Sequence, residues 1–180
     1  MIASVCVRPS TATITAPAGW TLVRRMDNPA SIANSLAVYL KTASAGEPAS
    51  YTWSLSAPTG SAGGISAFSG VDTSSPVDSD AGQSTPSSLT HATPSLTTGT
   101  ARTMLVTSHA MSSSATWTSP AGLTETFDVA SLTVPNGAGM SIECNHALQV
   151  APSATGILSA VASGDADNGN THILALKQAP

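Results

Sequence analysis

The sequence predicts an all-β protein, an antiparallel β-sandwich of jelly-roll type with about eight or nine strands. Gly, Pro, Ser and Thr interrupt nearly every window, so no long segment keeps the apolar spacing of a helix. Short apolar or alternating runs recur along the chain, with turn residues between them. Only 9% of the 180 residues are charged, and 28 Ser and 23 Thr carry the polarity instead. A single domain over 1–180 is expected, because all-β domains often reach this length.

The first half contains five segments of strand character. Met1–Val7 is an apolar run typical of a buried strand. Tyr51–Leu55 alternates large apolar with small polar residues, which predicts that Tyr51, Trp53 and Leu55 share one face. The other three segments are Trp20–Arg25, Ser35–Lys41 and Gly64–Phe68.

The second half repeats this rhythm after a connecting segment, 73–103, that is rich in Asp, Ser, Thr and Pro. We expect one strand within that segment, near Leu89–Thr97. The five strands predicted after it are Met104–Ala110, Leu123–Val129, Met140–Val150, Ile157–Ala162 and His172–Leu176.

The two halves, 1–72 and 104–180, align with each other. At an offset of 103, Met1 falls on Met104, and both halves share Ala-Thr-x-Thr-x-Pro-Ala-Gly-x-Thr. With small shifts, 51–56 falls on 157–162 and 64–68 falls on 172–176. A duplicated sandwich half explains this register. The alternative is chance similarity between segments rich in small residues.

The alignment also predicts a strand that the first half lacks. Leu89–Arg102 can supply a strand before Met104, whereas nothing in the sequence precedes Met1. Either this half does without the strand, or another chain or subunit supplies it by strand addition. We therefore expect intermolecular contacts from an uncovered strand edge or from the extended segment 71–103. The residues at that edge are Met1, Ile2, Ala3, Ser4 and Val5.

Charge and hydropathy exclude several classes of partner. The net charge is −4 and the six Lys and Arg residues are scattered, so a nucleic-acid partner is not expected. No apolar run approaches the roughly 18 residues of a membrane span. Arg8 and Pro9 come too early for a secretory signal peptide.

Four stretches carry a resemblance to a known family: Val7–Val23, Glu47–Trp53, Gly63–Gly64 with Phe68–Asp78, and Leu174–Lys177. Together they resemble Ser/Thr-rich β-sandwich modules of large bacterial extracellular proteins and of phage virion proteins. The resemblance implies a spacer, an adhesive unit, or a capsid or tail appendage. Members of the family usually have about one more strand upstream of the position of Met1, and Cys6 and Cys144 are not part of the pattern.

The sequence contains no motif that predicts catalysis. No Gly-x-Ser-x-Gly, His-Glu-x-x-His, P-loop or Gly-x-Gly-x-x-Gly sequence occurs, so neither an enzyme nor a cofactor is expected. His91, His109, His146 and His172 lie far apart on separate predicted strands and do not predict a zinc site.

Two acidic clusters contain residues that calcium can use. The first is Asp72, Asp78 and Asp80, and the second is Asp165, Asp167 and Asn168. However, Asn168-Gly169 is also a common hairpin-turn pair, and we expect a turn rather than a metal site.

The cysteines and tryptophans each leave two interpretations open. Cys6 and Cys144 could form a disulfide across a long loop, but two buried thiols are expected in a core of this size. Trp20, Trp53 and Trp117 could stack on sugar rings, but packing roles are expected. Trp20 and Trp117 align with the aliphatic Leu123 and Ile14, and Trp53 shares an alternating face with Tyr51 and Leu55 that we expect to face the core.

We therefore expect a non-enzymatic structural or interaction module that acts through protein–protein contacts in the virion or outside the cell. A phage virion component, such as a capsid decoration or tail appendage, is the first interpretation. The alternative is a carbohydrate-binding or adhesive module of a bacterial surface protein, with a glycan as partner.

Overall fold

The computed structural model describes residues 1–180 and confirms the predicted all-β class. The first half forms strands β1 (Ile2–Arg8), β2 (Ile14–Thr15), β3 (Thr21–Asn28), β4 (Asn34–Leu40), β5 (Ser54–Leu55) and β6 (Gly60–Ser66). The rest of the chain forms β7 (Val77–Ser88), β8 (Thr90–Ala92), β9 (Thr103–Met111), β10 (Trp117–Thr118), β11 (Thr124–Ala130), β12 (Ser141–Gln149), β13 (Ser159–Ala162) and β14 (Asp167–Leu176). The structure contains no helix that could span a membrane.

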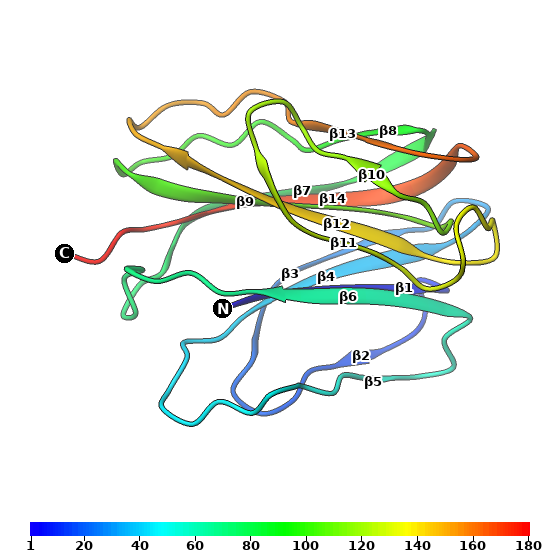
Figure 1. Cartoon of the computed structure of the whole chain (residues 1–180), viewed down its shortest axis with the longest axis horizontal. Helices are drawn as coiled ribbons and strands as arrows, with labels where there is room; N and C mark the ends of the chain where they lie inside the picture. Colours follow the sequence, from blue (N-terminus) through cyan, green and yellow to red (C-terminus); the bar gives the residue numbers. More distant parts are fainter.

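The strands form four stacked sheets (Figure 1). Two large sheets face each other: the first in the order β3-β4-β1-β6, the second in the order β11-β12-β9-β14-β7. The first small sheet, β2-β5, covers the outer face of the first large sheet, and the second small sheet, β10-β13-β8, covers that of the second. The sandwich is therefore coated by a thin layer of strands on both sides.

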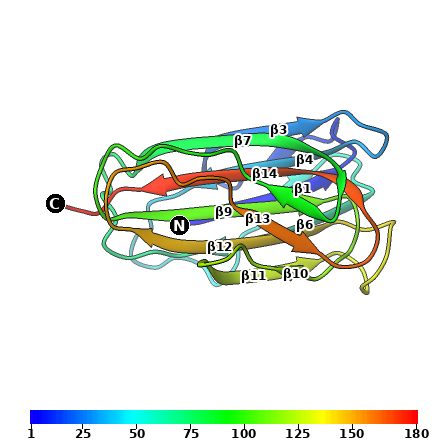
Figure 2. The ribbon, with the colours of Figure 1, turned by 90° about the horizontal axis from the view of Figure 1, so that it is seen from above.

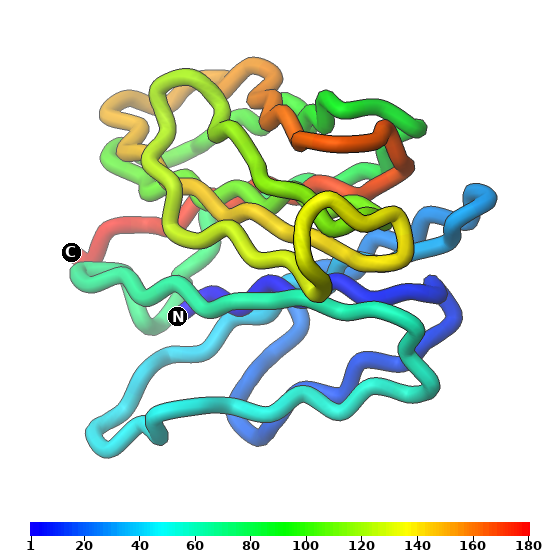
Figure 3. Tube along the Cα trace, turned by 45° about the vertical axis from the view of Figure 1, so that its right-hand side comes forward, coloured from blue at the N-terminus to red at the C-terminus, as the bar shows by residue number.

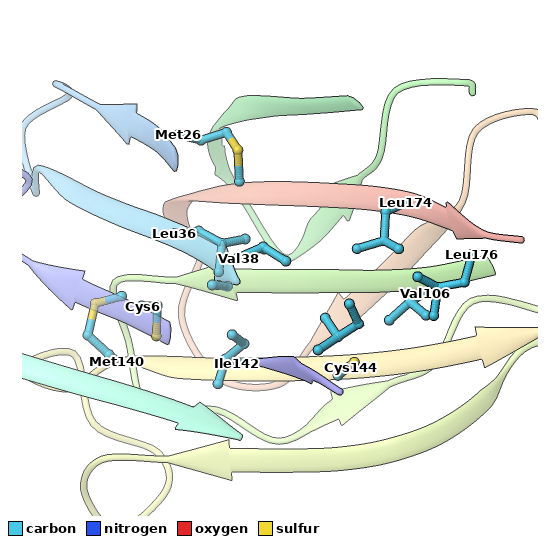
Figure 4. Packing of buried hydrophobic residues seen from close by; sticks show 12 residues of the cluster. Cys6, Met26, Leu36, Val38, Val106, Met140, Ile142, Cys144, Leu174 and Leu176 are labelled. Atoms are coloured by element: carbon cyan, nitrogen blue, oxygen red, sulfur yellow. The ribbon is translucent and has the colours of Figure 1, made fainter. Parts of the chain in front are cut away.

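The main hydrophobic core lies between the two large sheets (Figure 4). Leu36 from β4, Ile142 from β12 and Leu174 from β14 are completely buried there. Each such aliphatic side chain contributes about 1.5–3 kcal/mol when it leaves water. Further apolar clusters fill the spaces between each large sheet and its small sheet.

The strand order supports the predicted duplication. The order β3-β4-β1-β6 becomes β11-β12-β9-β14 when eight is added to each number, and β2-β5 becomes β10-β13 in the same way. All of these pairs are antiparallel. The two halves therefore share one fold.

The repeated Pro-Ala-Gly turns occupy corresponding corners. Gly19 and Gly122 have φ values of +85° and +82°, a region that favours glycine. In each turn a backbone N–H donates to a proline carbonyl three residues back, Trp20 to Pro17 and Leu123 to Pro120. Both turns lead into the outer strand of a large sheet, β3 or β11, and each of these strands has one irregularity in its register.

The pairing register identifies equivalent positions more accurately than the sequence alignment. Ser4 pairs with Val38 and Gly64, as Ser108 pairs with Cys144 and His172. Ser4 thus corresponds to Ser108, an offset of 104, so the expected match of Met1 with Met104 is wrong by one residue. The match of Gly64 with His172 is confirmed.

The two equivalent serines meet at the centre of the sandwich. The Ser4 and Ser108 hydroxyl oxygens lie 2.8 Å apart and share a hydrogen bond between the facing sheets. The contacts between the halves are also reciprocal: β14 contacts β3 and β4, as its equivalent β6 contacts β11 and β12. A two-fold axis produces reciprocal contacts of this kind. The halves therefore pack with approximate two-fold symmetry.

Several predicted elements differ from the structure. The jelly-roll connectivity is not found, because each large sheet is formed by one half of the chain. Two observed strands are shorter than predicted: only β5 forms within 51–55, and only β8 forms within 89–97. The 12-residue strand β7 was not expected, because its segment is polar and contains Pro86, which an edge strand can tolerate.

Candidate interaction site

The structure corrects the prediction of an uncovered edge at residues 1–5. Strand β1 is central in its sheet and pairs with β4 on one side and β6 on the other. Ile2, Ala3, Ser4 and Val5 are buried within the chain, and only Met1 is partly exposed. Sequence order did not reveal that strands from later in the same half would cover β1 on both sides.

The uncovered edge lies instead at β6. In the second half, β7 pairs with β14 and β8 pairs with β13. The equivalents of β14 and β13 in the first half are β6 and β5, and neither has a partner on that side. Seen down the stack, β7 lies over β3 at one end, whereas β11 lies beyond β6 at the other (Figure 2). The place of a fifth strand in the first large sheet is vacant.

Burial of equivalent residues shows the effect of this vacancy. Ile173 in β14 is fully buried, whereas its equivalent in β6, Ile65, is 37% exposed. Likewise Met26 in β3 is 7% exposed, whereas its equivalent in β11, Val129, is 36% exposed. Both exposed residues flank the position where a strand paired with β6 would lie.

An open groove of about 510 Å³ follows β6 on the side of the first small sheet. Its floor is formed by β6 itself, and its walls include Tyr51, Trp53 and Leu55. The predicted shared face of these three residues is thus confirmed. The expectation that they face the core is wrong in extent, because each is only half-buried and lines this open groove. In the second half, Leu158 and Ala81 pack over Ile173 at the corresponding place.

A second, shallower groove flanks the start of β6. It has a volume of about 330 Å³ and lies between residues 58–61 and the Ser131–Leu132 pair after β11. Figure 3 follows the teal β6 past the yellow loop at this point. Farther along, the Phe127 ring packs so closely on Gly64 that a Cβ there would lie 2.7 Å from it. Grooves therefore flank the free edge of β6 toward both neighbouring sheets.

The candidate calcium residues are engaged in hydrogen bonds within the protein. The Asp167 carboxylate accepts from the Ser113 hydroxyl and from the backbone N–H of Asn168. The Asn168 amide donates to the Ile32 carbonyl. Asn168 and Gly169 lie within β14 at an irregularity, so the predicted hairpin turn at this pair is wrong.

Asp72, Asp78 and Asp80 have separate partners. Asp72 accepts from Ser74 and Asp78 accepts from Thr100. Asp80 is bound by His172 and Arg24, and these hydrogen bonds lower its pKa to about 2 despite partial burial. No group of three or more His, Cys, Asp or Glu side chains is arranged to hold a metal ion.

Three of the four histidines are completely buried on the second large sheet and β8. Burial lowers the pKa of His91, His109 and His172, and that of His109 falls to about 4. His91 and His109 both lie against the Trp117 ring. Nearby, Glu143 is also buried, which raises its pKa, and it accepts a hydrogen bond from Ser119. His91, His109 and Glu143 thus form a polar layer between the second large and small sheets, whereas His172 faces the first large sheet and binds Asp80. Sequence reasoning did not identify this layer.

Cys6 and Cys144 are free thiols in the main core. Burial raises their pKa values to about 12 and about 11. Trp20 and Trp117 are also buried, so neither presents a ring face to solvent. Trp53 packs against Trp20 and Tyr39 and contributes to the groove beside β6.

Comparison with known proteins adds no relative: no family model, curated protein or solved structure matches this chain. The choice of the β6 edge as the candidate interaction site therefore depends on the geometry alone. The one signal of an unpaired edge in the sequence was the alignment of its two halves. That signal did not identify the strand left without a partner.

Proposed function

We propose that this protein is a structural and interaction module that works through protein–protein contacts in a larger assembly. The observation that carries the proposal is the unequal covering of two like halves, which leaves the β6 edge open beside an apolar groove. An unprotected strand edge is a template for pairing with another chain, and proteins usually cover or charge such edges. No residue of β6 is charged.

Within this role, we assign the module to a phage virion, as a capsid decoration or tail appendage. The basis is the resemblance of its Ser/Thr-rich segments to virion modules. A sandwich with small sheets on both outer faces and three smaller buried clusters beside the main core suits a component that must persist outside the cell.

The direct test is to tag the chain in its native genome and to separate the products by density gradient. We expect the tagged chain to band with DNA-containing particles and to be present in many copies per particle by quantitative mass spectrometry. Recovery with the cell-surface fraction and not with particles would reject the virion assignment in favour of a surface module.

A glycan-binding or adhesive module is the second candidate, because Tyr51 and Trp53 line the groove beside β6. An aromatic wall next to hydroxyl-bearing residues such as Ser50 and Ser61 has the chemistry of a sugar site. Binding to a glycan array that is lost in Trp53→Ala but retained in Trp117→Phe would support it.

A further inference from the structure

We propose that the free edge of β6 binds an extended segment of another polypeptide as an added, antiparallel strand. This inference deepens the proposed function and rests on it, because it names how the module joins its assembly. The protein itself provides the template: β7 occupies this position in the second half, antiparallel to β14.

The register of β7 predicts where each side chain of the added strand lies. In the second half, Asp80, Ala81 and Gly82 are opposite Leu174, Ile173 and His172. The matching positions of β6 are Ser66, Ile65 and Gly64. A side chain at the position of Ala81 therefore points into the 510 Å³ groove beside Ile65 and Tyr51.

The opposite face of the added strand would contact an apolar residue where β7 contacts a charged one. Asp80 of β7 forms an ion pair with Arg24 of β3 at 2.6 Å. The equivalent of Arg24 in β11 is Phe127, because both follow the irregularity at the same point of their strands. The partner strand should therefore carry an apolar residue where β7 has Asp80.

These features also separate the partner from a second copy of this chain. A second β6 would bring Gly63 and Gly64 to the centre of the pairing, and glycines cannot fill a groove of this size. The favoured occupant has side chains on both faces, which β6 lacks. A dimer formed through β6 edges is therefore an outcome that would contradict the proposal.

The first test measures binding of two synthetic peptides to the full chain. One peptide has the sequence of residues 76–93, and the other is its Asp80→Val form. We expect the Val form to bind at least about tenfold more tightly, because it faces Phe127. Hydrogen exchange should show new protection at the β6 amides and no loss of protection in β7, which would separate edge binding from displacement of the resident β7.

Backbone pairing predicts an alternating effect of N-methylation. Methylation of two residues of one parity, such as Ala81 and Gln83, and of the other parity, Gly82 and Ser84, removes donors from opposite edges of the peptide. Only one of these two peptides should lose binding. Equal loss in both, or in neither, would show that binding does not depend on an added strand.

Matched variants of the protein locate the binding site. Ile65→Asp places a charge in the groove and should weaken peptide binding by at least about tenfold. Ile157→Asp, at a residue 69% exposed in a distant loop, should leave binding unchanged. Both side chains are surface-accessible, so a melting curve for each variant confirms that the fold persists.

A covalent graft removes any dependence on peptide affinity. A copy of residues 71–104 placed before Met1 reproduces the order of the second half at an effective concentration near millimolar. We expect protection of the β6 amides, a higher melting temperature and loss of peptide binding. The proposal would be wrong if hydrogen exchange at β6 were unchanged in the graft and neither peptide bound. It would also be wrong if the native chain formed dimers and Ile65→Asp dissociated them.

The outcomes keep this inference distinct from the proposed function. If Ile65→Asp still enters particles at the normal copy number, strand addition at β6 is wrong and the virion role stands. If the peptides bind β6 but the chain is absent from particles, the virion role is wrong and strand addition at β6 is supported.

Discussion

Ser4 and Ser108 illustrate how this protein uses hydroxyl groups where other proteins use charge. Both are about 1% exposed, and their hydroxyl groups share a hydrogen bond in the centre of the core. A buried hydroxyl without a partner costs about 1–3 kcal/mol, whereas removal of both partners leaves nothing unsatisfied. Loss of one hydroxyl of the pair should therefore cost more free energy of unfolding than the hydrogen bond itself contributes.

This reasoning predicts strong coupling between the two serines. Ser4→Ala and Ser108→Ala should each lower the free energy of unfolding by about 1–3 kcal/mol. The double variant should lose clearly less than the sum of the two. Urea denaturation of all four proteins measures the coupling, and additive losses would show that the hydroxyls do not depend on each other.

The buried histidines predict a loss of stability in mild acid. Their pKa values are lower in the native state than the unfolded value of about 6.5, so the unfolded chain binds more protons below that pH. Stability is therefore complete above pH 6.5 and falls as the pH falls through it. With a native pKa of about 4, His109 alone accounts for about 2 kcal/mol between pH 7.5 and pH 5.

Urea melts at pH 7.5, 6 and 5 test this expectation. His109→Gln keeps an amide donor for the Leu158 carbonyl, which the imidazole Nε2 reaches at 3.3 Å. The stability of this variant should fall less steeply between pH 7.5 and 5 than that of the native protein. An identical pH dependence in both proteins would exclude His109 as a source of the effect.

At the scale of elements, the first small sheet depends on aromatic packing more than on its four paired residues. Trp20 and Trp53 have ring centroids 5.2 Å apart, and Trp20 and Tyr51 meet edge to face at 5.3 Å. Trp20 is 8% exposed, whereas Trp53 is half-buried at the groove. Their contributions to stability should differ accordingly.

We expect Trp20→Ala to cost about 3–5 kcal/mol, the usual range for a buried aromatic side chain. Trp53→Ala should cost clearly less, because part of its ring already contacts solvent. Denaturant melts of the two variants provide the comparison. A larger loss for Trp53 would mean that the groove closes over it in solution.

Strands of the large sheets with apolar side chains could be predicted from the sequence. Short strands that form only by packing against a large sheet could not. The apolar runs at β1, β4, β9 and β14 predict buried strands because nearly every side chain enters a core. The two-residue strands β2 and β10 have no such pattern, because they exist only by packing on a large sheet. Likewise, alternation at 51–55 predicted the shared face but not the short extent of β5.

The candidate site shows the same division. The duplication predicted that a strand was lacking, since that requires only a comparison of the two halves. Its location depends on which strands pair, and pairing here joins β6 to β1 across more than fifty residues. A sequence read in order assigns the vacancy to the strand that comes first, which is the wrong edge.

At the scale of the whole molecule, the two halves have kept their fold while their contacts have diverged. Where the second half is completed by β7, an ion pair between Arg24 and Asp80 closes the end of the sandwich. At the opposite end, Phe127 lies on Gly64 and no strand covers it. At these symmetric positions, one end of the sandwich is therefore closed by a polar ion pair, and the other end is apolar and uncovered.

The division of the sheets between the halves has a mechanical consequence for the chain. All strands of the first large and small sheets lie within residues 2–66, and all strands of the second pair lie within residues 77–176. The covalent link between them is one surface segment, in which Thr73, Ser74 and Ser75 are exposed. The molecule is in effect a tethered heterodimer, in which the main core is the subunit interface.

A nick in this tether should therefore leave the protein intact. If a protease site is inserted after Ser74 and cleaved, the fragments should remain together through gel filtration in native buffer and separate only in denaturant. Fragments that part on cleavage would show that the tether supplies stability beyond proximity. With the expected result, residues 73–75 become a suitable place to insert a foreign domain, because they are exposed and belong to no strand.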